Sequence, residues 1–200
     1  MRNSVKKVFT DNLIEGNPDD ACLLNTLLNL PSYNVRFKAE GKRTLIFDPV
    51  RKKYVTLTPE EWVRQHIINY LVTEKKYPTS LISVEMPLKY AGLDKRSDLL
   101  VCDRNGQPLM LIECKAPEVT ITEKVFEQIA IYNLAIKASN SLSFGEDWEG
   151  VPYIMITNGK QHYCLIAATK DSPARFLNEI PEYKELKNLF LKTKSESNAQ

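Results

Sequence analysis

Two apolar runs separated by Asn105-Gly106 make up the segment Ser97-Asp-Leu-Leu-Val-Cys-Asp-Arg-Asn-Gly-Gln-Pro-Leu-Met-Leu-Ile-Glu-Cys-Lys115. Asn-Gly is typical of a two-residue β-hairpin loop, because a type I′ turn needs positive φ at both central residues. We therefore predict two antiparallel strands joined by this turn. Counting outward, the residues that face one another are Arg104 and Gln107, Cys102 and Leu109, Leu100 and Leu111, and Asp98 and Glu113.

Charged residues stand at the far end of this predicted hairpin. Asp98 faces Glu113, and Lys115 shares the face of Glu113 because strand side chains alternate. Two facing carboxylates repel each other, so positive charge must compensate them. Lys115 and a divalent cation are the two candidates. A surface hairpin with solvated charges is the alternative interpretation, but the apolar runs indicate buried strands, where unpaired charges are costly.

An aspartate, a glutamate and a lysine around a metal ion form a site that can cleave phosphodiesters. We predict Asp98 and Glu113 as the metal ligands and Lys115 as the residue that orients or deprotonates the attacking water. The main-chain carbonyl of Cys114 lies between two of these residues and is a further candidate ligand. Mg²⁺ is the expected cofactor, with Mn²⁺ as a substitute, because hard cations prefer oxygen ligands.

Two helices are predicted to flank this hairpin. The first begins at Thr58-Pro59-Glu60-Glu61, where Thr58 is the N-cap and Glu61 completes a capping box. Arg64, one turn later, faces either phosphate or solvent, and Arg96, beside Asp98, is a candidate phosphate contact. The second helix follows Thr120 or Thr122 and runs to about Ser139. On it, Gln128 and Tyr132 are four residues apart on one face.

The motifs Lys95-Arg-Ser-Asp-Leu-Leu100 and Leu111-Ile-Glu-Cys-Lys-Ala-Pro117 resemble the PD-(D/E)XK nuclease superfamily. Within it, the sequence is most similar to the N-terminal nuclease domain of type I restriction enzyme R subunits, over about residues 48 to 165. The resemblance implies a restriction-endonuclease-like three-layer α/β fold with a mixed central sheet flanked by helices. We expect an N-terminal β decoration and C-terminal helices in addition.

The resemblance also implies roles for individual residues. Glu61 matches a glutamate that reaches toward the metal in this superfamily, so it is either a helix cap or an auxiliary catalytic ligand. Gln128-Ile-Ala-Ile-Tyr132 matches a Gln-x-x-x-Tyr motif, in which Gln128 bonds the substrate backbone or a lysine and Tyr132 supports it. The expected function is metal-dependent hydrolysis of DNA phosphodiester bonds, as in restriction or repair.

One departure from the R subunits concerns their ATP-driven motor. The 200 residues contain no G-x-x-x-x-G-K-[ST] phosphate loop. We therefore expect either a stand-alone endonuclease or a module that depends on partners, namely other subunits of a restriction or repair complex or a second copy. Two alternatives remain open: a nuclease fold used only for DNA binding or assembly, and an α/β domain whose charges form an internal ion cluster.

Composition sets broader limits on the chain. A hydrophobic content of 43% and a charged content of 26% are those of a soluble globular protein. The net charge of +2 provides no global basic field, so a DNA-binding surface must be local. The candidate basic stretches are 36–43, 51–53 and 89–96. The predicted segments are 1–47 (a helix and antiparallel strands), 48–170 (the nuclease-like core) and 171–200 (C-terminal helices and a disordered tail).

The four cysteines show no C-x-x-C spacing, which argues against a zinc site. The sequence has neither a signal peptide nor an apolar run of transmembrane length, so we expect a cytoplasmic protein without a membrane partner.

Further expected elements are strands at 33–39, 43–47, 54–57 and 81–86, loops at 88–96 and 139–150, a hairpin at 151–168 around Asn158-Gly159, and short helices after Pro18, after Ser172 and at 181–191.

Overall fold

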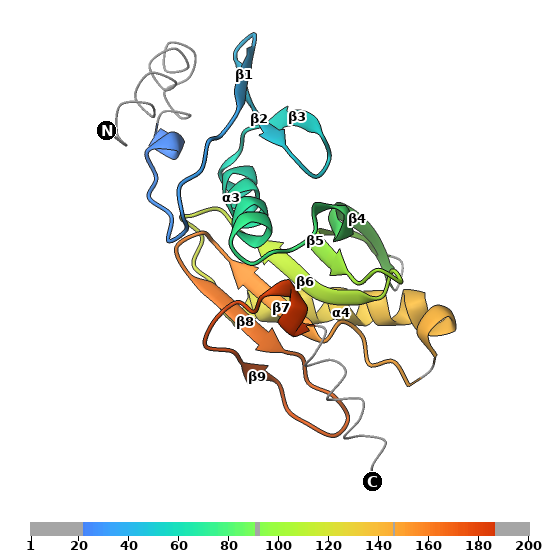
Figure 1. Cartoon of the computed structure of the whole chain (residues 1–200). Helices are drawn as coiled ribbons and strands as arrows, with labels where there is room; N and C mark the ends of the chain where they lie inside the picture. Colours follow the sequence, from blue (N-terminus) through green and yellow to red (C-terminus); the bar gives the residue numbers. More distant parts are fainter. Residues whose placement is uncertain (1–21, 91–92, 146, 187–200) are drawn as a thin grey trace.

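The structure is a computed structural model that describes residues 22–90, 93–145 and 147–186. Its strands and helices surround one large sheet and one small sheet (Figure 1). In chain order they are β1 (Phe37–Glu40), β2 (Arg43–Asp48), β3 (Lys53–Thr56), α3 (Pro59–Thr73), the 3₁₀ turn η1 (Thr79–Leu81), β4 (Ile82–Tyr90), β5 (Leu93–Cys102), β6 (Pro108–Cys114), α4 (Glu123–Phe144), β7 (Tyr153–Thr157), β8 (His162–Ile166) and β9 (Arg175–Phe176).

The large sheet has six strands in the order β4-β5-β6-β7-β8-β9. Its neighbouring strands are antiparallel except for β6 and β7, which are parallel. A parallel pair needs a long crossover, and α4 provides it. Every residue of β6 and β7 is buried, as expected for central strands covered on both faces.

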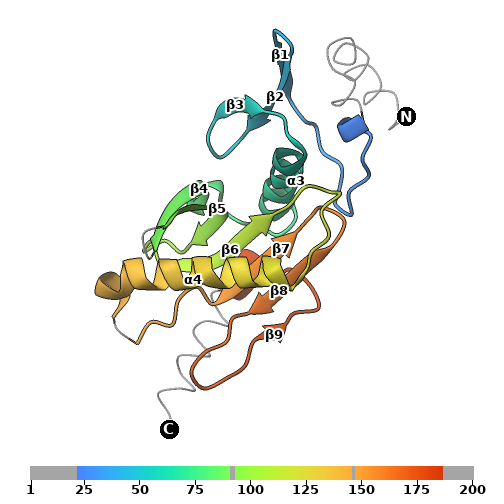
Figure 2. The same cartoon turned by 180° about the vertical axis from the view of Figure 1, so that it is seen from behind.

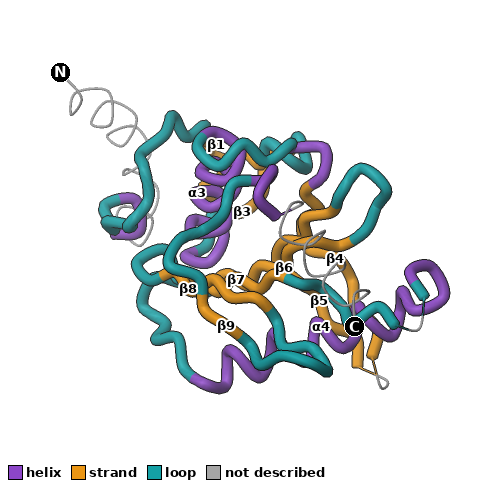
Figure 3. The backbone as a smooth tube through the Cα atoms, turned by 60° about the horizontal axis from the view of Figure 1, so that its bottom comes forward, coloured by secondary structure: helices purple, strands orange, loops and turns teal. Residues whose placement is uncertain are grey.

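The two long helices cover opposite faces of this sheet (Figures 1 and 2). Alternation along the strands divides the core accordingly: Leu99 and Ile112 pack in the cluster that contains α3, whereas Leu100 and Leu111 pack in the cluster that contains α4. The tube view also places the sheet between the helices (Figure 3). The predicted three-layer α/β fold with a mixed central sheet flanked by helices is therefore confirmed.

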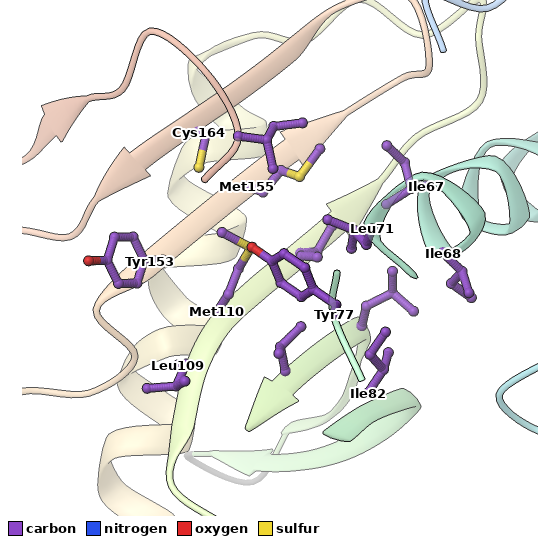
Figure 4. Close-up of a cluster of buried hydrophobic side chains, with 14 of the residues drawn as sticks. Ile67, Ile68, Leu71, Tyr77, Ile82, Leu109, Met110, Tyr153, Met155 and Cys164 are labelled. Carbon is purple, nitrogen blue, oxygen red and sulfur yellow. The ribbon is translucent and has the colours of Figure 1, made fainter. Parts of the chain in front are cut away.

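Tyr77 closes the α3 side of the core (Figure 4). Its ring is buried beside Met110, and its hydroxyl donates to the carbonyl oxygen of Pro181 at 3.0 Å. A buried tyrosine hydroxyl needs such a partner. The contact ties the C-terminal segment, where residues 183–186 are helical, to the centre of the sheet.

The small sheet has the order β1-β2-β3 and projects from the rest of the molecule (Figure 1). One of its faces carries Phe37, Ile46 and Val55, which pack on Trp62 of α3. This is the expected β decoration before the core. The predicted boundary between positions 47 and 48 lies within β2, and the division into segments stays a prediction.

The β5–β6 hairpin has the predicted central register but a different turn. Leu100 pairs with Leu111, as expected, whereas Cys102 pairs with Pro108 because of a bulge next to Val101. Only Gly106 in this turn has positive φ, so the turn is not type I′. The Asp103 carboxylate accepts from the backbone N–H groups of Asn105 and Gln107 and stabilises a loop longer than two residues. The bulge next to Val101 compensates for the extra loop residue, so the strand register beyond it is as predicted.

Three other predicted elements are wrong. Of the expected loop at 88–96, residues 88–90 lie in β4 and residues 93–96 lie in β5. The expected loop at 139–150 is shortened because α4 continues to Phe144. The helix expected after Ser172 is replaced by the short strand β9 at the sheet edge. The start of the helix at Pro18, most of the helix at 181–191 and the tail at 195–200 lie outside the described residues.

Candidate active site

Asp98 is brought to the centre of the charged site by the β5–β6 register. The pairs Leu100–Leu111 and Leu99–Ile112, continued by one residue, bring Asp98 level with Glu113. Asp98 is 8% exposed. Its Oδ2 accepts from the backbone N–H of Cys114 at 2.6 Å, and its Oδ1 accepts from Nη2 of Arg64, also at 2.6 Å. Both carboxylate oxygens of Asp98 therefore have partners.

Glu113 at the end of β6 is only half satisfied. Its Oε1 accepts from Nζ of Lys115 at 2.7 Å and from Nε2 of Gln128 at 2.6 Å. Its Oε2 is buried and has no hydrogen-bond partner among the residues that the structure describes. Burial, followed by the charge of Asp98, raises the pKa of Glu113 to about 7, although Lys115 opposes the shift. The site thus holds one buried carboxylate oxygen that lacks a ligand.

Lys115, Gln128 and Tyr132 form a short chain beside Glu113. Lys115 Nζ donates to Oε1 of Gln128 at 3.2 Å, and Gln128 Nε2 lies 2.7 Å from the Tyr132 hydroxyl oxygen. Burial lowers the pKa of Lys115, but its hydrogen bond to Glu113 and the nearby carboxylates outweigh burial and raise it. Lys115 therefore keeps its proton, which favours orienting a water over deprotonating it.

Arg64 of α3 lies inside the molecule rather than at its surface. Its guanidinium binds Asp98, Glu60 at 3.0 Å, and Glu61, while only 6% of its side chain is exposed. Burial disfavours the charged form of Arg64, but Asp98 and Glu61 outweigh burial and raise its pKa. The charge of this arginine is thus fixed beside the carboxylate of Asp98.

The capping box predicted for Glu61 is wrong, because its side chain enters the site and only its backbone N–H contributes to the helix cap. The N–H of Glu61 donates to Oγ1 of Thr58 at 3.1 Å, which confirms Thr58 as the N-cap. Its carboxylate accepts from Arg51, Arg64 and Gln65. Both Glu61 oxygens are therefore engaged by neighbouring donors.

Arg51 is the site residue that sequence reasoning missed. From the β2–β3 turn it donates to Asp48 at 2.5 Å, to Glu85 at 2.6 Å and to Glu61 at 2.9 Å. The only sequence signal was the basic stretch at 51–53, and nothing local indicates that one of its residues turns inward. We call the following set the arginine network: Arg51, Arg64, Asp48, Glu60, Glu61, Glu85 and Asp98.

Glu85 is the second residue whose place in the site was not expected. The β4–β5 register brings Glu85 level with Asp98, between the pairs Val84–Leu99 and Met86–Ser97, but Glu85 itself forms no pair with β5. Glu85 has a φ of +53°, a conformation that is strained for a residue with a side chain. In this conformation its carboxylate accepts from Arg51. Arg96, whose side chain is 64% exposed, lies 3.8 Å from the same carboxylate.

The carboxylate oxygens of the site are suitable ligands for a hard divalent cation, but they are not arranged as a complete metal-binding site. Within residues 22–90, 93–145 and 147–186, no group of three His, Cys, Asp or Glu side chains is arranged to hold a metal ion. Glu113 Oε2 is buried and unpaired, which fits a cation. The oxygens of Glu61, by contrast, accept from arginines, and those of Asp98 accept from Arg64 and from the backbone N–H of Cys114. Oε2 of Glu113 is therefore the carboxylate oxygen of these three residues that has no donor in the described part of the chain.

The other predicted site residues lie around Asp98 and Glu113. The side chain of Cys114 is buried in the core on the α3 side, while its backbone N–H binds Asp98. The structure thus brings together Asp98, Glu113, Lys115, Gln128, Tyr132, Arg64 and Glu61, and it leaves Arg96 at the rim. No helix among the described residues has the length and apolar character needed to span a membrane.

Comparison with known proteins places the chain in a family. The family described as type I restriction enzyme R protein N terminus (HSDR_N) matches residues 59–181. A solved fragment assigned to an HsdR subunit of a type I restriction enzyme from Vibrio vulnificus YJ016 is 18% identical, with a TM-score of 0.43 over 66% of this chain and 25% of that chain. The chain thus spans about a quarter of that structure. Comparison with curated proteins gives no match.

Proposed function

Since this chain belongs to the type I restriction enzyme R protein N-terminal family, we propose that it is a Mg²⁺-dependent DNA nuclease domain. The membership confirms the resemblance that its sequence motifs suggest. The residues matched, 59–181, contain α3, the β5–β6 hairpin and α4, which together carry the candidate site. The nuclease activity, its metal and its substrate are our proposal.

The observation that supports this proposal is the buried carboxylate oxygen Oε2 of Glu113, which has no hydrogen-bond partner among the described residues. A buried carboxylate with one unpaired oxygen is costly unless a ligand satisfies that oxygen. A proton or a cation can serve, and the negative charge of the neighbouring Asp98 favours either of them. Asp98, Glu113 and the carbonyl of Cys114 would hold Mg²⁺, with Glu61 as an auxiliary ligand. When bound, the ion supplies an activated water and neutralises phosphate charge.

The surrounding side chains fix the geometry of the reaction. Lys115, held between Glu113 and Gln128, orients the attacking water through its ammonium group. Gln128 is locked by Tyr132 and keeps Lys115 in place. Arg64 neutralises the carboxylate of Asp98, and its guanidinium would also donate to a phosphate bound beside that carboxylate. Arg96, exposed at the rim, contacts the DNA backbone further out.

The first test is cleavage of plasmid DNA and single-stranded DNA with Mg²⁺ or Mn²⁺. Wild type should cut, and Glu113→Gln should not, because an amide oxygen carries no charge for the cation. Glu127→Gln is the matched control, since Glu127 is exposed on α4 next to Gln128. Equal cutting by Glu113→Gln and wild type would overturn the assigned site.

Lys115→Ala separates chemistry from folding. The variant should bind Mn²⁺ and keep its fold while losing cleavage by about 100-fold or more, a usual loss when a donor that positions a reacting group is removed. Mn²⁺ binding is measured by isothermal titration and folding by circular dichroism. Unfolding of Lys115→Ala would instead support an internal ion cluster whose charges serve structure.

A second candidate is a nuclease fold that binds DNA or assembles with partners without cutting alone. The arginine network favours it, because Arg51 and Arg64 engage oxygens that a metal would need. In this case the wild type shifts DNA in a gel and never cuts it, at any metal concentration. Cutting would then require other subunits of a restriction complex. The cytoplasmic location stays a prediction.

A further inference from the structure

We propose that the outer face of the β1–β3 sheet binds the sugar-phosphate backbone of DNA and guides the strand into the candidate site. We call this surface the basic face, formed by Arg36, Lys38, Glu40, Arg43, Phe47 and Tyr54, with three cations and one carboxylate. The inference rests on the proposed function for its substrate. The inference specifies a surface that binds DNA outside the candidate active site.

The register of the small sheet separates its two faces. Phe37, Ile46 and Val55 lie level with one another, and all three pack on the α3 side with Trp62. Alternation then directs the next residues along the strands, Lys38 among them, to the other face. The cations of the basic face are exposed, and Lys38 lies 3.5 Å from the carboxylate of Glu40 on the same face.

Charge is concentrated in this part of the chain. Positions 36–53 contain seven lysines and arginines and two acidic residues, a net charge of +5, whereas the entire chain carries only +2. The remaining 182 residues are therefore net negative by three charges. Of these seven cations, Arg51 turns inward and the other six are exposed on the small sheet and its turns. Such a local concentration of cations on a projecting element is the expected electrostatic footprint of a nucleic-acid contact.

Aromatic rings are interleaved with these cations. The Arg36 guanidinium lies 3.5 Å above the centre of the Phe47 ring, and the Phe47 and Tyr54 rings meet edge to face with centroids 5.3 Å apart. Tyr54 is 39% exposed, which is high for a large aromatic residue. Cations that follow a backbone, together with an exposed ring on which a base can stack, are the usual parts of a surface that binds unpaired nucleic acid.

A groove connects the basic face to the candidate site. It has a volume of about 510 Å³, with Leu45, Tyr54 and Thr56 on the sheet side and Glu61, Arg64 and Glu85 on the other. The groove is lined by three cations, Arg51, Lys53 and Arg64, and by four carboxylates, Glu40, Glu60, Glu61 and Glu85. A phosphate that enters it therefore binds through the cations against a small net negative charge. A strand lying on Tyr54 is thereby led toward Arg64 and Asp98.

The experiment measures DNA binding in EDTA, so that cutting does not interfere. Fluorescence anisotropy follows a labelled 20-nucleotide single strand and its duplex at several salt concentrations. The double variant Lys38→Ala/Arg43→Ala should bind at least 10-fold more weakly, and the slope of log affinity against log salt should fall by about 1.4–1.8 for two lost contacts. Tyr54→Ala should weaken single-strand binding by roughly 5-fold or more, and Tyr54→Phe should restore it.

The control is Lys170→Ala/Lys184→Ala, which removes the same charge from exposed positions outside the basic face. It should change affinity by less than two-fold. The proposal is overturned if this control loses as much affinity as the basic-face variant, or if Lys38→Ala/Arg43→Ala keeps the wild-type affinity and salt slope. Equal loss of heparin binding and no effect of Tyr54→Ala would also overturn it, because the face would then be a general polyanion surface.

The two proposals fail in distinguishable ways. If the protein binds DNA through the basic face in EDTA but never cuts it, the DNA-binding proposal holds and the nuclease proposal is wrong. If the protein cuts DNA in Mg²⁺ and Lys38→Ala/Arg43→Ala cuts at the same rate, the nuclease proposal holds and the DNA-binding proposal is wrong. Circular dichroism melting of each variant checks that weaker binding does not come from unfolding.

Discussion

At the scale of single residues, Glu113 decides the electrostatics of the site. A carboxyl whose pKa is raised to about 7 binds a proton more tightly in the folded chain than in the unfolded chain. Its contribution to stability is therefore full below the unfolded pKa of about 4.5 and is lost as the pH rises through 7. Metal-free protein at pH 8 thus carries an ionised, half-satisfied carboxylate.

Glu113→Gln tests this linkage, because glutamine does not titrate. Relative to wild type, the free energy of unfolding of the variant should rise between pH 5 and pH 8, by at most about 3 kcal/mol. Urea unfolding in EDTA at four pH values measures the difference. Glu127→Gln, on the exposed side of α4, should show a flat profile. A flat profile for Glu113→Gln as well would mean that its carboxyl titrates normally.

Sequence reasoning located the residues of the site that share a hairpin or a helix turn. Asp98 and Glu113 followed from counting register, and Gln128 with Tyr132 followed from helical spacing. The pair of Arg64 and Asp98 could not be derived, because the two residues are 34 positions apart and meet only when α3 packs on the sheet. The inward turn of Arg51 depends in the same way on tertiary packing.

At the scale of elements, turn chemistry was the weakest part of the sequence prediction. Asn105-Gly106 correctly marked a hairpin, but Asp103 accepts backbone N–H groups and lengthens the loop. The register nevertheless survived, because a one-residue slip would exchange the α3 and α4 faces of a fully buried strand. Burial therefore fixed the pairing, and the bulge at Val101 absorbed the extra residue.

The β7–β8 turn offers a test of how closely elements pack. Gly159 has a φ of +81°, and a Cβ there would lie 2.7 Å from Leu28 and 3.1 Å from Val63 of α3. Gly106 has nearly the same φ, +80°, with nothing within 4 Å of an added Cβ. Gly106→Ala should cost about 1 kcal/mol from backbone strain alone, and Gly159→Ala about 1–2 kcal/mol more.

Thermal and urea unfolding of the two glycine variants provide the comparison. Because both replacements place alanine in the same backbone conformation, their difference isolates the contact with Leu28 and Val63. Equal destabilisation of the two variants would show that the N-terminal segment moves aside without cost.

At the scale of the whole molecule, Arg51 joins the small sheet to the large one. It leaves the β2–β3 turn and binds Glu61 of α3 and Glu85 of β4, with 15% of its side chain exposed. The contact holds the basic face in a fixed position relative to the candidate site. Removing it leaves three carboxylates, Asp48, Glu61 and Glu85, with one partner fewer.

Arg51→Ala should lower the free energy of unfolding by about 3–5 kcal/mol, as expected when one partner of a buried ion pair is removed. Lys42→Ala, at the exposed tip of the β1–β2 hairpin, is the control and should change it by less than about 0.5 kcal/mol. Calorimetry of both variants is the measurement. A small loss for Arg51→Ala would mean that the small sheet is held by its contacts with Trp62 alone.

The parallel pairing of β6 with β7 has a consequence for how the chain is made. A ribosome delivers β4, β5 and β6 in succession, so the antiparallel meander forms early. The partner of the other β6 edge emerges only after α4, about 40 residues later, which takes roughly 2–8 s at ordinary rates of translation. During that interval the nascent sheet has an apolar, unpaired edge at what will become its centre. The speed of translation through α4 therefore sets how long the unfinished chain is open to aggregation.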